Sequence, residues 1–148
     1  AMTGFQPHPG TGISGMSESV PKIIIEDVAR GVGVKHVFTV DPFDLKGAIK
    51  VISKALEITQ EKGEVAVVVS RRKCSILTTR ERKQNNVSII PWAVDPDICI
   101  GCRICVDKFA CPAISFSNEK AKIDPVICLD CGVCLQICPS KAIRREDQ

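Results

Sequence analysis

The sequence predicts two parts of different fold class: an α/β segment over residues 1–73 and a small α+β domain over residues 95–148, joined by a linker over residues 74–94. The first part alternates helical and β-branched patterns, which is typical of layered α/β domains. The second part holds eight of the nine cysteines, all between Cys99 and Cys138, in a unit that occurs twice. Clustered cysteines of this kind indicate metal ligands in a chain without a secretory leader.

The α/β segment opens with a loop and a short helix. Residues 1–17 are rich in glycine and proline and show no hydrophobic periodicity, so we expect a loop. Ser19 and Pro21 predict the start of a helix, with Ser19 as its cap and Pro21 in its first turn. Apolar residues then recur at helical spacing over residues 24–29, and Gly31 is expected to end the helix.

A strand, a long helix and a second strand follow. The short apolar run at residues 36–40 predicts a strand. Between Asp44 and Gly63 the apolar residues occupy one helical face and lysines and glutamates the other, which predicts an amphipathic helix capped by Asp44. Residues 64–70 are a β-branched run without alternation, which is typical of a strand buried on both faces of a parallel sheet.

Two strands are too few for a sheet that is covered on both faces, because a buried strand needs a neighbour on each side. We therefore expect that residues 1–73 either pair with another chain or belong to a domain whose other part precedes Ala1.

The linker carries a basic run, including Arg80, Arg82 and Lys83, that is expected to be a solvated face. A docking surface for an acidic electron acceptor is the alternative, because opposite charge steers association. Cys74 lies outside the repeated spacing and is expected to be a small apolar residue and not a ligand.

Charge and hydropathy argue against two broad classes of protein, those that bind nucleic acid and those that span a membrane. Residues 1–94 carry 13 Lys/Arg against 9 Asp/Glu, and residues 95–148 carry 7 against 8, for a net charge of +3. The chain has neither a dominant basic face nor a nucleic-acid-binding motif, so no nucleic acid partner is expected.

No apolar run is long enough to span a bilayer, for which a helix needs about 20 apolar residues. No signal segment opens the chain either, so we expect no membrane span and a cytoplasmic location.

The α+β domain is an internal duplication. Asp95-Pro96 recurs as Asp124-Pro125, and we call the separation of these two pairs the repeat offset. The three cysteines after the first Asp-Pro recur at the same offset after the second. The fourth cysteines, Cys111 and Cys138, each precede a proline but are closer together than the repeat offset, so the first repeat has two extra residues before its Cys-Pro.

The spacing of the cysteines predicts two [4Fe–4S] clusters. The run from Cys128 to Cys138 follows the pattern C-x2-C-x2-C-x3-C-P, which is typical of two-cluster bacterial ferredoxins. Three cysteines so spaced can bind three corners of a cubane, and in these ferredoxins the fourth ligand comes from the other repeat. The predicted ligands are a first group, Cys99, Cys102, Cys105 and Cys138, and a second group, Cys128, Cys131, Cys134 and Cys111.

A pair of structural zinc sites is the alternative for these cysteines. Zinc takes four ligands, and C-x2-C pairs are its usual source. It leaves no role for a third cysteine at i+6 in both runs or for two Cys-Pro endings, so the clusters are favoured.

The chain resembles the C-terminal part of the large (α) subunit of indolepyruvate:ferredoxin oxidoreductases, within the thiamine-diphosphate-dependent 2-oxoacid:ferredoxin oxidoreductase superfamily. The likeness covers essentially the whole chain. It rests on the opening motif at residues 1–10, the stretches 33–37 and 40–42, the helix after Asp44, and the cysteine domain with its five-residue spacer before Cys111.

The resemblance implies that residues 1–73 are the C-terminal portion of a thiamine-diphosphate-binding domain and that residues 95–148 are a bacterial-type 2[4Fe–4S] ferredoxin domain. In that family a Gly-Asp-Gly motif and an Asn, both upstream of the opening motif, hold the Mg²⁺ and the diphosphate. Neither is present in this chain. Thr3 and Gly4 are expected at the edge of the thiamine diphosphate site of an intact subunit. The chain alone is expected to be inactive in decarboxylation, and no catalytic residue is assigned to it.

For the intact enzyme, the resemblance implies oxidative decarboxylation of an aryl pyruvate with transfer of the acyl group to coenzyme A. Electrons would leave through the clusters to an external ferredoxin, and a smaller (β) subunit would be the partner. Three alternatives stay open: a subunit of another 2-oxoacid:ferredoxin oxidoreductase, a free-standing low-potential electron carrier with an unrelated α/β appendage, and a scaffold protein whose clusters are structural.

Overall fold

The computed structural model describes residues 9–87 and 91–145. The chain divides into two compact units, with the boundary between Arg72 and Lys73. The boundary lies two residues after the end of the second strand of the α/β segment. Everything after it, including the segment expected to be a linker, belongs to the unit that contains the eight clustered cysteines.

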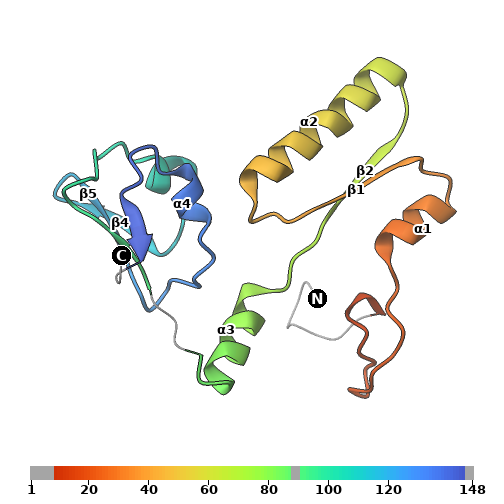
Figure 1. Ribbon diagram of the computed structural model, residues 1–148, viewed down its shortest axis with the longest axis horizontal. Coiled ribbons are helices and arrows are strands. Elements are labelled where there is room, and N and C mark those ends of the chain that lie inside the picture. The colour runs from red at the N-terminus through yellow and green to blue at the C-terminus, as the bar shows by residue number, and fades with distance from the viewer. Residues whose placement is uncertain (1–8, 88–90, 146–148) are drawn as a thin grey trace. The chain divides into compact units, whose positions relative to one another are not determined.

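The first unit is built around a β-α-β arrangement (Figure 1). After η1 (Pro9–Thr11) and α1 (Ile25–Gly31), strand β1 (His36–Val40) leads into helix α2 (Leu45–Lys62), which returns the chain to strand β2 (Ala66–Ser70). The two strands pair in parallel with His36 opposite Ala66, and parallel neighbours need such a crossover. Helix α2 packs against both strands.

Helix α2 agrees with its sequence prediction at both ends. The Asp44 carboxylate accepts a hydrogen bond from the Gly47 N–H at 3.0 Å, which satisfies a free donor of the first turn. Gly63 follows the last turn in the left-handed conformation, with a φ of 63°. The buried residues of α2 are Ala55 and Ile58, which lie one turn apart on the same face.

Helix α1 begins later than the sequence predicts. Ser19 forms a bridge with Ile13, and the Val20 N–H donates to the Gly12 carbonyl at 3.0 Å, so these residues pair with the preceding loop. The helix begins at Ile25, after Ile24, which provides no side-chain cap. The predicted start at Ser19 and Pro21 is therefore wrong.

Strand β2 is shorter and more exposed than its apolar sequence suggests. Val69 is buried in β2 and Val40 in β1, but residues 66–68 are only half-buried and Val65 is exposed. A run expected to be covered on both faces is thus incompletely covered among the described residues. The parallel sheet that these residues form has two strands, which explains the exposure.

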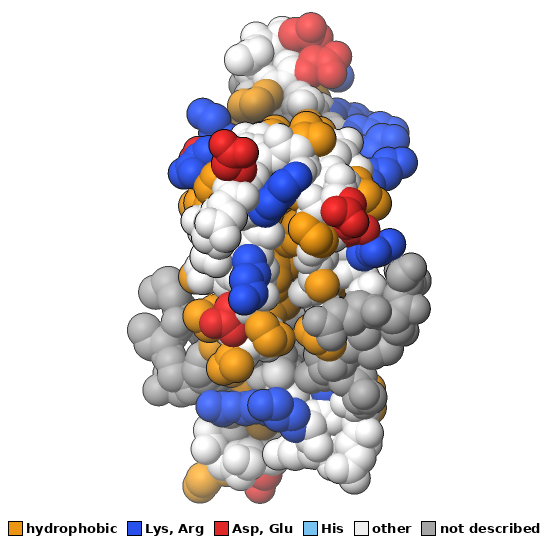
Figure 2. Space-filling model, turned by 90° about the vertical axis from the view of Figure 1, so that its left-hand side faces the viewer, with side chains coloured by type: hydrophobic (Ala, Val, Ile, Leu, Met, Phe, Trp, Pro, Cys, Tyr) orange, Lys and Arg blue, Asp and Glu red, His pale blue; other side chains and the backbone are white. Residues whose placement is uncertain are grey.

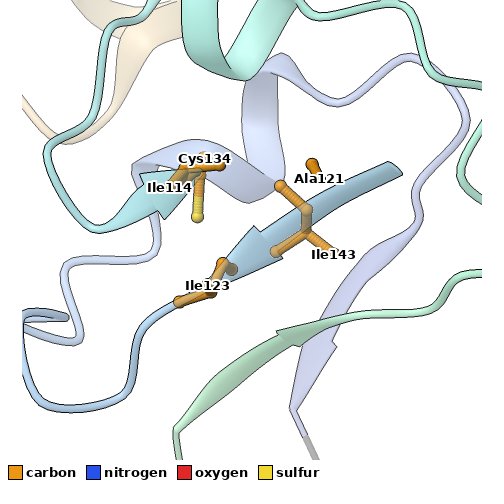
Figure 3. Close-up of a cluster of buried hydrophobic side chains, with 5 residues drawn as sticks. All are labelled: Ile114, Ala121, Ile123, Cys134 and Ile143. Carbon is orange, nitrogen blue, oxygen red and sulfur yellow. The ribbon is translucent and has the colours of Figure 1, made fainter. Parts of the chain in front are cut away.

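The second unit contains helix α3 (Ser75–Gln84) and the duplicated domain. The domain has two antiparallel strand pairs, β3 (Trp92–Val94) with β6 (Ile143–Arg145) and β4 (Ile114–Ser117) with β5 (Lys120–Ile123). It also has a π-helical turn, η2 (Ile104–Lys108), and helix α4 (Val133–Ile137). Its buried core is drawn in Figure 3 and consists of Ile114, Ala121, Ile123, Cys134 and Ile143.

Two elements lie where a linker is expected. Helix α3 has no buried residue and little apolar periodicity, so the hydrophobic pattern gives no helical signal there. It is held partly by charges, because the Lys73 ammonium donates to the Glu81 carboxylate at 2.6 Å. Strand β3 pairs with β6 and so extends the duplicated domain to Trp92, three residues before Asp95.

One face of the molecule shows side chains of mixed character. On the face drawn in Figure 2, basic and acidic side chains are interspersed with hydrophobic ones, and neither sign of charge forms a continuous field. Among residues 9–87 and 91–145, no helix is both long enough and apolar enough to span a bilayer.

Candidate metal centres

The backbone joins the beginning of each cysteine repeat to the end of the other. The Asp95 N–H donates to the Ala142 carbonyl at 2.8 Å, and at the repeat offset the Asp124 N–H donates to the Ala113 carbonyl, also at 2.8 Å. Ala113 lies two residues after Cys111, and Ala142 lies four residues after Cys138. The fourth cysteine of each repeat is therefore brought back toward the first three cysteines of the other.

The loops that carry the cysteines share an unusual backbone pattern. Gly101 and Arg103, on either side of Cys102, have φ values of 65° and 62°. Their counterparts in the second repeat, Asp130 and Gly132, have φ values of 54° and 70°. Each repeat thus places a left-handed residue directly before and directly after its second cysteine, and this turns the loop tightly.

The first group of cysteines lines one cavity. Its walls include Cys99, Cys102, Cys105 and Cys138, together with apolar residues of both repeats. Burial raises the pKa of the Cys105 thiol, and the nearby charges of Cys102, Cys99 and Cys138 raise it further. The structure therefore brings together the four residues that the sequence predicts as one ligand set.

The second group is more deeply buried. Burial raises the pKa of the Cys134 thiol to about 12, and the charges of Cys131, Cys128 and Cys111 add to the shift. Cys134 is a member of the buried core cluster of the domain, which also includes Ile114 (Figure 3). These four cysteines are again neighbours, and Cys111 comes from the other repeat.

Hydrogen bonds are directed at the sulfur of Cys138. Burial raises the pKa of this thiol, but hydrogen bonds from the Ser140 hydroxyl and from the backbone N–H groups of Ala142, Ile143 and Ser140 outweigh burial and lower it. The Ser140 hydroxyl lies 3.7 Å from the sulfur. Donors aimed at a thiolate stabilise its negative charge, as they do around sulfur ligands of metals.

The extra residues of the first repeat fall after η2. Residues 104–108 of η2 correspond at the repeat offset to residues 133–137 of α4, but η2 is π-helical and α4 is α-helical. Phe109 and Ala110 are the additional residues before Cys111, and Ala110 has a φ of 50°. The wider turn and the left-handed residue accommodate the two additional residues. The next strand resumes the common register because the first repeat has two fewer residues between its Cys-Pro and that strand.

Not every predicted site residue joins these groups. Thr3 and Gly4 lie outside the described residues. Cys74 belongs to neither group; its carbonyl accepts hydrogen bonds from the Thr78 N–H and hydroxyl at the start of α3.

Within the described part of the chain, no three His, Cys, Asp or Glu side chains approach closely enough to hold a single metal ion. A cubane spreads its four thiolates over its corners, so the two groups of cysteines need not meet that criterion.

Sequence reasoning missed two residues in or beside the loop that carries Cys131. The Asp130 side chain, directly before Cys131, is 5 % exposed and pairs with Arg82 of α3. Trp92 packs behind the same loop, since a side chain at Gly132 would meet its ring at 3.4 Å. Comparison of the two repeats could have drawn attention to Asp130, which takes the place of a glycine, but nothing in the sequence links it to Arg82.

The donor set and the loop geometry fit an iron–sulfur protein with two clusters. Residues 91–139 match the family model of the 4Fe-4S dicluster domain. The chain therefore carries a domain of this class, and its iron–sulfur character agrees with the sequence prediction.

The whole chain is similar to proteins named indolepyruvate oxidoreductase subunit IorA. It is 43% identical to that of Archaeoglobus fulgidus over 97% of this chain, 42% to that of Thermococcus kodakarensis over 96%, and 40% to that of Pyrococcus horikoshii over 98%. In each case the match covers 22% of the relative, so the chain spans about a fifth of the length of these proteins. The resemblance drawn from the sequence is confirmed: the chain is similar over nearly its whole length to a segment of such subunits, and it carries the 4Fe-4S dicluster domain. No solved structure matches the chain.

Proposed function

We propose that this chain is the iron–sulfur electron-transfer portion of an indolepyruvate:ferredoxin oxidoreductase. Bound [4Fe–4S] clusters supply one-electron acceptor and donor sites. The observation that carries the proposal is the arrangement of the cysteines in two groups of four, each of which takes one member from the other repeat. Two sites that share the strands of one small domain are suited to passing an electron between them.

The chain's own residues have distinct tasks in this proposal. The first group, Cys99, Cys102, Cys105 and Cys138, would hold one cluster, and the second group, Cys128, Cys131, Cys134 and Cys111, would hold the other. Left-handed residues around Cys102 and Cys131 let the backbone approach closely. The apolar neighbours of the first group, such as Ile143, exclude water, and the donors around Cys138 adjust its charge.

The remainder of the proposal concerns a longer protein. Residues 1–73 would be the C-terminal portion of its thiamine-diphosphate-binding domain, with Thr3 and Gly4 at the edge of the site for thiamine diphosphate and Mg²⁺. Such a protein would oxidatively decarboxylate an aryl pyruvate in the cytoplasm, acylate coenzyme A, associate with a smaller (β) subunit and reduce an external ferredoxin. Support comes from relatives that match residues of both units, which argues against an unrelated α/β appendage.

Anaerobic reconstitution with iron and sulfide tests the proposal. Two [4Fe–4S] clusters require about eight irons per chain. In the Cys138→Ala variant we expect about half the iron and the loss of one cluster signal, while the cluster of the second group persists. Cys74→Ala is the matched control and should retain both clusters. Loss of the second group's cluster in Cys138→Ala would contradict the crossed ligand sets, and about one metal ion per group would contradict the clusters themselves.

A further inference from the structure

We propose that Arg82, on helix α3, is a positioning residue that sets the reduction potential of the cluster held by the second group of cysteines, through its ion pair with Asp130. The inference rests on the proposed function, since it requires a cluster at this site. It concerns a helix that lies outside the segment matched by the 4Fe-4S dicluster model.

Asp130 is a buried carboxylate inside a cysteine loop. It lies between Cys128 and Cys131, and its side chain is 5 % exposed. Arg82 Nη1 donates to its Oδ2 at 2.6 Å across a separation of 48 residues. Arg145 Nη2 lies 3.1 Å from the other oxygen, Oδ1, and forms an ion pair with it. The geometry of that pair does not meet the criteria for a hydrogen bond. The well-aligned partner of this carboxylate is therefore Arg82.

Arg145 is itself held by an aromatic ring. Its guanidinium carbon lies 4.4 Å from the centroid of Trp92, and the same ring packs beside Gly132, the residue after Cys131. Arg145 on β6 and Trp92 on β3 are also partners in the antiparallel pair. Both are therefore fixed by the sheet, whereas Arg82 reaches Asp130 from a helix that precedes the duplicated domain.

The first repeat has no equivalent of this pair. The position of Asp130 corresponds to Gly101, which has no side chain, and the position of Gly132 corresponds to Arg103. Arg103 forms a pair with Asp107 at 2.8 Å, in which both side chains are about half exposed. The buried carboxylate of the first repeat, Asp95, lies four residues before Cys99 and pairs with Arg144 at 2.7 Å. Between the first and the third cysteine, only the second repeat has a buried carboxylate with a distant basic partner among the described residues.

Charge near a cluster changes the free energy of adding an electron to it. A positive charge favours the reduced state and a negative charge disfavours it, and burial weakens the screening by water. Removing the Arg82 charge leaves Asp130 less compensated and lowers the potential. Removing the Asp130 charge leaves two arginines unopposed and raises it. Opposite signs from two members of one pair are not expected from a merely structural defect.

Redox titration of the reconstituted chain of residues 1–148, followed by electron paramagnetic resonance, tests this. We expect two midpoint potentials in the wild type, one of which is assigned to the second group because Cys131→Ala removes it. Arg82→Gln should lower that midpoint and Asp130→Asn should raise it, each by up to about the 59 mV that corresponds to a tenfold change in a one-electron equilibrium. The other midpoint should stay in place.

Two further variants complete the test. Lys83→Gln removes the same charge from the adjacent, exposed position of α3 and should leave both midpoints unchanged. Arg82→Lys keeps the charge and should have a midpoint close to that of the wild type. If Asp130→Asn does not assemble its cluster, the Arg82 series decides alone. Two wild-type midpoints that Arg82→Gln does not move, or moves no more than Lys83→Gln does, would overturn the inference and leave the proposed function intact. A wild type without two clusters would overturn the proposed function.

Discussion

The left-handed residues around the second cysteine of each repeat are the clearest determinants of site geometry at the scale of single residues. Gly101 and Gly132 both need positive φ, which costs other residues about 1–2 kcal/mol. Their surroundings differ. A Cβ on Gly101 would lie 2.6 Å from the backbone oxygen of Glu119, whereas a Cβ on Gly132 would lie 3.4 Å from the side chain of Trp92.

Gly101→Ala should therefore be more damaging than Gly132→Ala. The first substitution combines backbone strain with a clash against the hairpin turn at Glu119, and the second brings the strain and only a tight side-chain contact. We expect reduced iron incorporation in Gly101→Ala and a lower temperature for loss of the cluster absorbance. Equal behaviour of the two variants would mean that the hairpin turn adjusts without cost.

The cysteines were predictable from the sequence because their spacing is itself the constraint set by a cubane. In the structure they form two groups, each of which takes its fourth cysteine from the other repeat. The pairing of Arg82 with Asp130 was not predictable, since it joins residues 48 positions apart. Neither residue stands out in composition, and surface arginines are usually solvated.

At the scale of elements, Glu26 connects three of them in the first unit. Its side chain is buried in α1, accepts a hydrogen bond from the Thr39 hydroxyl of β1 at 2.5 Å, and pairs with Arg71, which follows β2. The hydrogen bond from Thr39 is the main cause of a lowered pKa, and the charge of Arg71 contributes. The ionised carboxylate therefore stabilises the packing of α1 on the strand pair.

A pH dependence follows from the direction of this shift. A carboxylate whose pKa is lower in the folded state adds stability above its unfolded value of 4.5, and this stability is lost as the pH falls through the folded pKa. We expect Glu26→Gln to reduce the free energy of unfolding at pH 7, and the difference from wild type to shrink below pH 4.5.

Urea unfolding followed by far-ultraviolet circular dichroism at several pH values measures this difference. Glu57→Gln, an exposed position on α2, is the control and should have little effect. A difference between Glu26→Gln and wild type that stays constant from pH 7 to pH 3 would show that packing and not charge is responsible.

Elements with a strong local signal agree with the sequence, and elements fixed by distant contacts do not. Helix α2 has a cap, an amphipathic face and a terminal glycine, each of which acts locally. The start of α1 depends on Ser19 pairing with Ile13, which competes with the capping role that the same serine could play. Helix α3 lacks an apolar face, so hydrophobic periodicity does not predict it.

At the scale of the whole molecule, the two units differ in what holds them together. The first packs α2 on a strand pair. In the second, the cysteines Cys99, Cys105, Cys111, Cys128 and Cys138 pack against the buried core, so the ligands are part of the hydrophobic interior. A small domain of this kind depends on its bound metal, because the core alone buries little apolar surface.

Removal of iron should therefore unfold one unit and spare the other. The single tryptophan, Trp92, lies in the second unit, while the longest helix, α2, lies in the first. After anaerobic chelation we expect the tryptophan emission to shift to longer wavelength while most of the helical circular dichroism remains. Simultaneous loss of both signals would show that the first unit depends on the clusters as well.

The pairing of β3 with β6 has a consequence for engineering. These strands are the first and last of the duplicated domain, and Trp92 lies opposite Arg145, so the chain enters and leaves the domain at neighbouring points. Segments whose ends meet can be inserted into an exposed loop of a host protein without stretching it. Residues 91–145 thus have the form of a transplantable cassette, which could give a redox-inactive scaffold a pair of electron sites at a position chosen by the designer.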